Sequence, residues 1–299
     1  MKKVLVLLLV LVLVLMPISA IAGQPADKDK GGSGTAENVE LVKKVTLKGS
    51  AAKAPRKAAT AATGVLGAAC AGTRYAIVVG ISDYPGEAND LSYADDDAEA
   101  MCVVLHETYG FETGNIKDLI DVNATKGAII AAITEMKKNI KPEDELVFFF
   151  SGHGAKGKAD DEDRSSVDQS IVVWNDAKDG FDYLWDGQLK TVFNDFTDNR
   201  IVFIFDSCLS GGMSVLKAPN RVVNMACSAN GLSYEGNWGD GHGQFTYYFA
   251  IEGMFAGLAD TSWDSDTVVT VEEAFDYSKA KCQYQTPVIA DMFTDDLLP

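Results

Sequence analysis

The stretch RIVFIFDSCLSGG, residues 200–212, joins an apolar run to a short polar segment that contains a cysteine. Its apolar half has the continuous character of a strand that is buried on both faces of a parallel sheet. The stretch ELVFFFSGHG, residues 145–154, repeats this arrangement and ends in a Ser-Gly-His-Gly segment. Ligands of open α/β sheets bind beyond the carboxyl ends of the strands. If the two strands are neighbours, Cys208 and His153 therefore meet at one edge of the sheet.

Apolar strands and amphipathic helices alternate on both sides of these two stretches. Tyr75–Ile81 (YAIVVGI) predicts another central strand, and shorter apolar runs predict further strands over Ile116–Ile120, Ser170–Trp174, Val222–Cys227 and Thr286–Met292. Helical spacing predicts helices over Ala94–Tyr109, Lys126–Ile140, Asp186–Phe196, Phe245–Leu258 and Val271–Ala280. This alternation predicts a three-layer α/β domain over residues 74–299, with a mainly parallel sheet.

The N-terminus has the pattern of a secretory signal peptide. Two lysines precede an unbroken apolar run of thirteen residues, Val4–Met16, and small residues follow at the cleavage-site positions. We predict a signal peptide over residues 1–22, cut after Ala22, and hence a secreted protein, extracellular or periplasmic. The alternative is an uncleaved membrane anchor, but the run is shorter than the about 20 residues that a spanning helix needs. No further long apolar stretch predicts a membrane association after cleavage.

Residues 23–73 have the composition of a leader or propeptide. They are rich in Ala, Gly, Lys and Thr, and only Val39–Leu47 has strand-like character. This part of the chain is basic, whereas the whole chain has a net charge of -17, which argues against nucleic acid as a partner. The five cysteines show no CxxC spacing, which argues against zinc and against a dense disulfide framework.

A cysteine beside a histidine is suited to nucleophilic catalysis. A thiol needs help to become a thiolate near neutral pH, and a neighbouring imidazole can take its proton and later protonate the leaving amine. The backbone N–H groups of Gly154 and Cys208 could form an oxyanion hole, in which one donor is worth about 2.7–4 kcal/mol. The alternative is that the glycines form a plain tight turn and that the cysteine is a buried core residue.

Several motifs together resemble metacaspases and prokaryotic caspase-like peptidases. The segments Phe149–Gly154 (FFSGHG) and Asp206–Gly211 (DSCLSG) are similar to the His and Cys motifs of these enzymes, and the 55 residues between His153 and Cys208 fit the caspase spacing of about 50. Further matching pieces follow in the family's order over nearly all of residues 74–299: 75–81, 91–98 (LSYADDDA), 227–229 (CSA), 233–235 (SYE), 243–246 (GQFT) and 285–287 (QTP).

The resemblance implies a caspase–haemoglobinase fold with a six-stranded, mainly parallel sheet flanked by helices. It also implies a Cys-His dyad, with His153 as base and Cys208 as nucleophile, and a protein or peptide substrate. In metacaspases the pocket for the residue before the scissile bond is acidic, and cleavage follows Arg or Lys. Asp97, Ser151 and Asp206 stand at the matching positions, where carboxylates would form charge-assisted hydrogen bonds with a basic side chain. The alternative for Asp97 is a charge at a helix N-terminus.

The resemblance also bears on activation. Basic residues in exposed segments would be self-cleavage sites of such an enzyme, and Lys217, Arg221 and Arg74 are the candidates. The chemistry needs no cofactor, but many metacaspases need calcium, and Asp168 and Asp186 match two of the expected ligand positions. Two carboxylates fall short of the six to eight oxygens that calcium prefers.

Other interpretations stay open. His242 is a rival base, although it follows no buried strand, and His106 reads as structural. The peptidase could have a different specificity, for Asp or Asn, or the fold could be an inactive binding module. Caspases pair through an edge strand whereas metacaspases are generally monomeric, and we favour a monomer.

Overall fold

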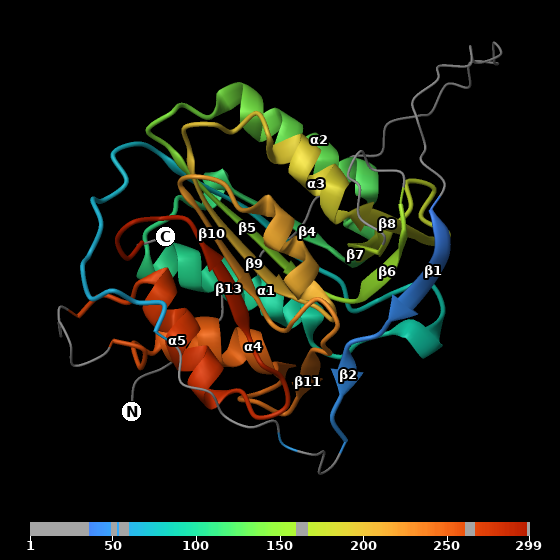
Figure 1. The fold of residues 1–299 in the computed structure, drawn as a ribbon. Coiled ribbons are helices and arrows are strands. Elements are labelled where there is room, and N and C mark those ends of the chain that lie inside the picture. The colour runs from blue at the N-terminus through green and yellow to red at the C-terminus, as the bar shows by residue number, and fades with distance from the viewer. Residues whose placement is uncertain (1–35, 49–52, 54–59, 160–166, 261–266, 298–299) are drawn as a thin grey trace, which may run out of the picture. The chain divides into compact units, whose positions relative to one another are not determined.

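The computed structural model of the protein describes residues 36–48, 53, 60–159, 167–260 and 267–297 (Figure 1). All of them belong to one compact unit, Gly34–Pro299. The predicted signal peptide, residues 1–22, lies outside the described residues. Within the described ranges, no helix combines the length and the apolar character needed to cross a bilayer.

A six-stranded sheet forms the centre of the domain. Its strand order is β13-β10-β9-β5-β3-β4, and every neighbouring pair is parallel except β10 and β13. The strands are β3 (Arg74–Gly80), β4 (Ile116–Ile120), β5 (Glu145–Ser151), β9 (Arg200–Asp206), β10 (Arg221–Met225) and β13 (Val288–Asp291). All seven residues of β5 are buried, as expected of a strand that is covered on both faces. The predicted mainly parallel six-stranded sheet is confirmed.

Helices cover both faces of this sheet (Figure 1). Phe148 and Phe203 pack toward α2 (Lys126–Asn139) and α3 (Asp186–Phe193), whereas Val147 and Ile204 belong to a separate apolar cluster on the opposite face. That second face is covered by α1 (Ala94–Val103), α5 (Val271–Lys281), and the continuous pair α4 (Gln244–Thr246) and π-helix Tyr247–Phe255. A π-helical turn, Val104–Thr108, prolongs α1. The predicted helices are present, with ends that differ by a few residues.

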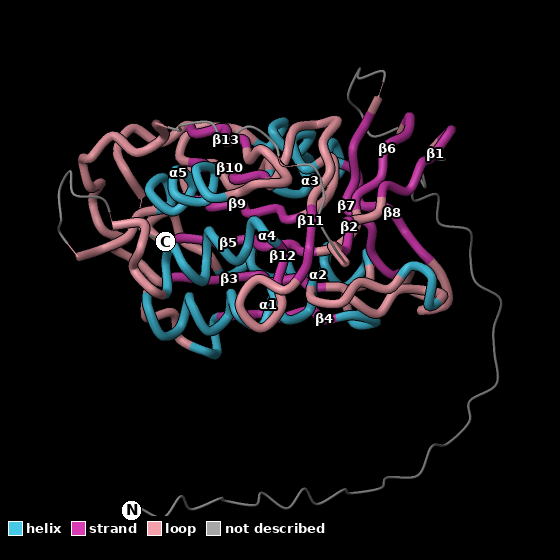
Figure 2. Tube along the Cα trace, turned by 90° about the horizontal axis from the view of Figure 1, so that it is seen from below, coloured by secondary structure: helices cyan, strands magenta, loops and turns pink. Residues whose placement is uncertain are grey.

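A second, four-stranded sheet lies beyond one end of the central strands, as Figure 2 shows. Its order is β1-β6-β7-β8, and all pairs are antiparallel. The strands are β1 (Glu37–Val42), β6 (Gly154–Lys158), β7 (Asp168–Trp174) and β8 (Phe181–Trp185). The apolar run predicted as a strand over Ser170–Trp174 therefore forms a strand, but in this sheet and not in the central one.

A third sheet has three short strands. Its order is β12-β11-β2, with β2 (Val45–Thr46), β11 (Tyr234–Gly236) and β12 (His242–Gly243). Short 3-10 helices occupy the connections at Glu87–Asn89, Thr113–Asn115, Asp121–Asn123 and Ser210–Leu216.

Residues 36–48, called the leader segment below, supply an edge strand to each of the two smaller sheets. β1 pairs with β6, directly after the His153 segment, and β2 pairs with β11. The strand-like stretch noticed in the sequence at Val39–Leu47 thus covers two short strands with a break at Lys43 and Lys44. The break falls between the two smaller sheets, where the leader segment crosses the carboxyl edge of the central sheet.

Candidate active site

The segments that follow β5 and β9 lie next to each other at the carboxyl edge of the sheet. β5 and β9 are parallel neighbours, and Ser151 at the end of one lies opposite Asp206 at the end of the other. His153 and Cys208 each follow two residues later in the chain. Gly154 approaches the backbone of Cys208 so closely that a Cβ at this position would collide with the Cys208 carbonyl. The structure therefore brings the two predicted reactive residues to one place.

The imidazole of His153 is buried and engaged at both ring nitrogens. Nδ1 accepts a hydrogen bond of 3.0 Å from the backbone N–H of Lys44, and Nε2 lies 2.7 Å from the carbonyl oxygen of Asn89. Because a carbonyl oxygen only accepts, these partners assign the ring proton to Nε2. Tyr84 stacks on the ring, with centroids 4.6 Å apart, and its hydroxyl accepts the backbone N–H of His153 at 2.9 Å.

Burial sets the protonation of both reactive groups. It lowers the pKa of His153 to about 4, against the opposing effect of the Asn89 carbonyl. It raises the pKa of Cys208 to about 12, although the backbone N–H of Ser233 donates to Sγ at 3.1 Å and lowers it. The thiol in turn lies 3.2 Å from the carbonyl oxygen of Lys43. The backbone of the leader segment thus contacts both members of the pair, the imidazole through Lys44 and the thiol through Lys43.

Asp97, Ser151 and Asp206, the residues expected to bind a substrate side chain, lie together and are buried, and they are called the acidic pocket below. Ser151 Oγ donates to Asp97 Oδ2 at 2.7 Å. Asp206 Oδ1 accepts from Ser233 Oγ at 2.6 Å, and its Oδ2 accepts from the backbone and the hydroxyl of Thr246 at 3.0 and 2.8 Å. These bonds hold both carboxylates in fixed orientations, so the pocket is prepared for a cation.

Lys44 of the leader segment fills this pocket. Its Nζ lies 3.3 Å from Asp97 Oδ2, 3.1 Å from Asp206 Oδ1 and 2.9 Å from Ser151 Oγ. Burial opposes the charge of this ammonium group, but the carboxylates of Asp206 and Asp97 outweigh burial and keep its pKa above its ordinary value. Burial likewise opposes ionisation of Asp97, and Lys44 then holds its pKa below the usual range. Lys44 is therefore held in the pocket as an ammonium ion.

Glu235 adds a third acidic side chain to the surroundings of Lys44. Its Oε1 accepts from Thr46 Oγ1 at 2.7 Å and from the backbone N–H of Ser92 at 2.9 Å. Its Oε2 is buried and has no hydrogen-bond partner among the described residues. Burial raises the pKa of this carboxyl, and Lys44 opposes that rise.

Sequence reasoning missed the roles of Lys44, Glu235 and Tyr84. A faint signal existed for two of them, because Lys44 stands in the only strand-like stretch of the leader, and Glu235 closes one of the matching motif pieces, residues 233–235. Tyr84 carried no such signal.

His242, the rival base, lies on the acidic pocket and not beside the thiol. Its Nδ1 lies 3.2 Å from Asp97 Oδ1, and its Nε2 lies 3.2 Å from Asp240 Oδ1. Burial lowers the pKa of His242, but the bond and the charge of Asp97 outweigh this, so the pKa is above its ordinary value. His242 thus supports Asp97. His106 is part of the turn that prolongs α1, where its Nδ1 lies 2.8 Å from the carbonyl oxygen of Phe111.

The two residues expected to bind calcium lie at one end of the β7–β8 pair. Ser170 of β7 lies opposite Trp185 of β8, so Asp168 and Asp186 come close to the same end. Asp168 is fully buried: its Oδ2 accepts the backbone N–H of Ala159 at 2.7 Å, whereas Oδ1 has no hydrogen-bond partner in the described part of the chain. Among the described residues, no group of three or more His, Cys, Asp or Glu side chains is arranged to hold a metal.

The three suggested self-cleavage residues differ in their accessibility. Lys217 is exposed, at the end of the 3-10 helix that follows Cys208. Arg221 is buried in β10, where its guanidinium donates to the carbonyl oxygens of Leu216, Phe193 and Phe196. Arg74 opens β3 and lies over the ring of Phe111. A protease could reach Lys217 in the folded protein, whereas cleavage at Arg221 would require unfolding of the central sheet.

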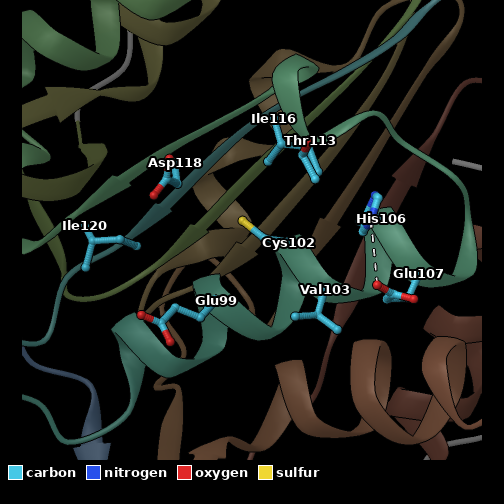
Figure 3. Close-up of a pocket in the computed structure, with 9 residues that line it drawn as sticks. All are labelled: Glu99, Cys102, Val103, His106, Glu107, Thr113, Ile116, Asp118 and Ile120. Atoms are coloured by element: carbon cyan, nitrogen blue, oxygen red, sulfur yellow. Dashed lines mark ion pairs between the residues drawn. The ribbon is translucent and has the colours of Figure 1, made fainter. Parts of the chain in front are cut away.

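A separate cavity of about 390 Å³ lies between α1 and β4, at the opposite edge of the central sheet from β13 (Figure 3). Cys102 points into it, and the pKa of this thiol is raised to about 12, first by burial and then by the nearby carboxylates of Asp118 and Glu99. His106 also lines the cavity, but its Nδ1 lies 2.8 Å from the carbonyl oxygen of Phe111, and no hydrogen bond joins it to Cys102 among the described residues. The raised pKa favours the thiol form of Cys102 over the nucleophilic thiolate.

Comparison with known proteins identifies the family of this chain. A family model described as the caspase domain matches residues 73–297. Metacaspase-1A of Aspergillus oryzae is 30% identical over 169 residues, which cover 51% of this chain and 40% of that protein. Metacaspase-1B of Aspergillus fumigatus is 27% identical over 244 residues, which cover 76% of this chain and 59% of that protein. The chain thus spans about half the length of the curated relatives that it matches.

A solved structure shares the fold. The crystal structure of a Geobacter sulfurreducens protein superposes with a TM-score of 0.52 at 19% sequence identity, covering 75% of this chain and 95% of the other. These matches confirm the predicted resemblance to metacaspases and the predicted fold class.

Proposed function

This chain belongs to the caspase-domain family of cysteine peptidases, and we propose that it is an endopeptidase that cleaves after Lys or Arg. The observation that carries the proposal is the occupied pocket: a lysine side chain is bound by two carboxylates and a hydroxyl at the edge where the thiol and the imidazole meet. A substrate side chain with the same charge would use the same contacts.

Cys208 acts as the nucleophile and His153 as the acid–base group. His153 Nδ1 takes the thiol proton, and the thiolate attacks the carbonyl carbon of the residue held in the pocket. The backbone N–H groups of Gly154 and Cys208 stabilise the oxyanion. Collapse of the tetrahedral intermediate breaks the C–N bond, and the leaving amine takes the proton from His153. Water then gives a proton to His153, attacks the thioester and releases the acid and the thiol.

Two further parts of the proposal concern export and activation. Residues 1–22 are removed as a signal peptide, and the protein acts outside the cytoplasm. Asp168 and Asp186, at the end of the β7–β8 pair, would hold an activating calcium ion, since Asp168 Oδ1 is a buried carboxylate oxygen with no hydrogen-bond partner in the described residues. Asp168 and Asp186 supply only part of the oxygens that calcium prefers. The chemistry at Cys208 requires no metal.

A panel of fluorogenic peptides tests the specificity. Peptides that differ only in the residue before the scissile bond, Lys, Arg, Asp or Asn, are incubated with the full chain and with the full chain that carries Lys44→Ala. We expect turnover of the Lys and Arg peptides by the variant, abolished by Cys208→Ala. Turnover of Asp or Asn peptides instead would contradict the specificity. No turnover of any peptide, with no labelling of Cys208 by a peptidyl electrophile, would favour a binding module.

A further inference from the structure

The leader segment crosses the candidate active site as a bound peptide would. β1 adds to the edge of β6, with Val42 opposite Gly154, and β2 adds to the edge of β11, with Val45 opposite Tyr234. Between these strands, Lys43 and Lys44 lie over the His153 and Cys208 segments. Strand addition at two edges supplies main-chain hydrogen bonds, and the pocket between them supplies a charged contact. The surface is therefore a complete binding site for a lysine-bearing strand.

Only one of the two lysines lies in the pocket. The Lys44 side chain is buried against Asp97 and Asp206. The Lys43 side chain is exposed, and its Nζ donates to the carbonyl oxygen of Ala88 at 2.7 Å. Lys44 is thus the residue that stands where the specificity-determining side chain of a substrate would stand.

The chain direction is wrong for cleavage after Lys44. The bond that must break lies on the C-terminal side of the residue in the pocket, and it must be flanked by the thiol and the imidazole. Here the bond between these two groups is on the N-terminal side: the oxygen of Lys43 faces Cys208 Sγ, and the nitrogen of Lys44 faces His153 Nδ1. The peptide bond on the C-terminal side of Lys44 makes a different contact: its nitrogen, Val45 N, donates to the carbonyl oxygen of Ser233 at 2.9 Å.

If the strand ran in the opposite direction, the N-terminal and C-terminal peptide bonds of the lysine in the pocket would exchange places. A strand that runs through the site in the opposite direction, with its lysine in the same pocket, would bring the C-terminal bond of that lysine between Cys208 and His153. The leader segment therefore occupies the substrate site with the opposite polarity to a productive substrate.

We propose that residues 36–48 are an inhibitory strand that blocks the enzyme and that the enzyme does not cut. The proposal rests on the proposed function, since it assigns the acidic pocket to the substrate. It explains why the pKa of Cys208 is raised and that of His153 is lowered: the leader segment contributes to the burial of both groups. Displacement of Lys44 exposes the thiol to solvent and frees His153 Nδ1 to accept its proton.

Alkylation of Cys208 tests the block independently of peptidase activity. Full-length wild type, Lys44→Ala and the matched control Lys48→Ala, whose side chain is exposed at the end of the leader segment, are treated with iodoacetamide. Labelling at Cys208 is then followed by peptide mass mapping. We expect labelling at least tenfold faster in Lys44→Ala than in wild type, and no change in Lys48→Ala. Equal rates in all three proteins would overturn the proposal, provided that thermal melting shows Lys44→Ala to be folded.

A synthetic peptide of residues 36–48 tests the direction. Added to the Lys44→Ala chain, it should bind, slow alkylation of Cys208 again and remain intact, whereas the same peptide with Lys44→Ala should not protect. Cleavage after either lysine would contradict the reversed polarity, even if the peptide protects. Faster labelling of Lys44→Ala and its protection by the peptide, without turnover of Lys or Arg substrates, would support the inhibitory strand and reject the proposed function. If Lys44→Ala folds poorly, Lys44→Met, which keeps the apolar stem of the side chain and removes its charge, replaces it in both experiments. Labelling of folded Lys44→Met no faster than that of wild type would overturn the proposal.

Discussion

Lys44 Nζ lies 3.1 Å from Asp206 Oδ1, and neither side chain is exposed to solvent. The two residues are far apart in the sequence, and the ion pair joins the leader segment to the end of β9. A buried charge is stable only when it is paired and hydrogen-bonded. The leader segment and the pocket are therefore energetically dependent on each other.

This dependence predicts a non-additive double-mutant cycle. Asp206→Asn in the wild-type background leaves Lys44 with one carboxylate fewer, and we expect the free energy of unfolding to fall by about 3 kcal/mol. In the Lys44→Met background no buried ammonium group is left to lose its partner, so the same substitution should have a smaller effect, with a coupling of about 1 kcal/mol or more. Urea unfolding measures all four proteins.

The control cycle uses Lys138 and Glu135, an exposed pair one helical turn apart in α2. Lys138→Met and Glu135→Gln should be additive within error, because water screens exposed pairs. Additivity in both cycles would show that the Lys44–Asp206 pair contributes no coupling.

Replacement of the two site histidines separates their roles. In the Lys44→Ala background, His153→Ala should lower kcat by about a thousandfold, in the range of a lost acid–base group. His242→Ala should leave kcat nearly unchanged and raise KM for Lys peptides, because Asp97 loses one of its hydrogen bonds. Steady-state kinetics with one Lys peptide decide between them. Loss of kcat only in His242→Ala would make His242 the base.

Tyr84 should act as a positioning residue for His153. Its hydroxyl accepts the His153 backbone N–H and donates to Val172 O at 3.0 Å. We expect Tyr84→Phe in the Lys44→Ala background to lower kcat roughly tenfold at unchanged KM, because the imidazole is less precisely held. Tyr109→Phe is the matched control, since its buried hydroxyl donates to Val269 O at 2.8 Å, remote from the site. A similar fall in kcat for both variants would indicate a stability effect alone.

Acid should release the leader segment. Burial lowers the pKa of His153 to about 4 in the bound state, below its ordinary value of 6.5. Above pH 6.5 the imidazole is neutral whether the leader is bound or released. Between pH 6.5 and 4 the released form takes up a proton and the bound form does not, so acidification favours release. Below pH 4 both forms are protonated and the His153 contribution changes no further.

The affinity of the 36–48 peptide for the Lys44→Ala chain measures this effect. We expect binding to be roughly tenfold weaker at pH 5.5 than at pH 7.5, from the proton uptake of one imidazole. Glu235 also faces Lys44 and has a raised pKa, so the measurement is repeated with Glu235→Gln. The same tenfold change there assigns the effect to His153, whereas tighter binding at pH 5.5 would contradict the sign.

Calcium dependence should depend on Asp168. In the Lys44→Ala background we expect calcium to raise activity on a Lys peptide, and Asp168→Asn to abolish this response while the activity without calcium persists. Isothermal titration calorimetry with calcium alone gives a readout besides activity. The control is Asp182→Asn, an acidic residue of β8 whose carboxylate lies 3.4 Å from Lys126 Nζ. Equal calcium binding by both variants would exclude Asp168 as a ligand.

The sequence predicted the central sheet and the reactive pair because both depend on local patterns. The apolar runs of β5 and β9 have the length and composition of buried strands, and each ends in its reactive segment. The run Ser170–Trp174 is equally apolar, and its assignment to a separate antiparallel sheet depends on the partners β6 and β8. Apolar character alone does not distinguish the two sheets.

The occupant of the pocket could not be predicted in the same way. Lys44 is one of many lysines in a basic leader, and its contacts with Asp97 and Ser151 span 53 and 107 residues of sequence. The pairing of β2 with β11 that holds it involves only two residues on the leader side. Such short strands leave no periodic pattern, so the direction of the leader segment is visible only in three dimensions.

The close approach of Gly154 to Cys208 has a consequence for how this domain can vary. The separation of nucleophile and base is fixed by main-chain atoms of two adjoining loops. Substitutions among the surrounding side chains can therefore accumulate without moving the pair, as long as the two strands keep their register. An added methyl group at position 154 would collide with the carbonyl oxygen of Cys208 and force the His153 and Cys208 loops apart, regardless of the surrounding side chains.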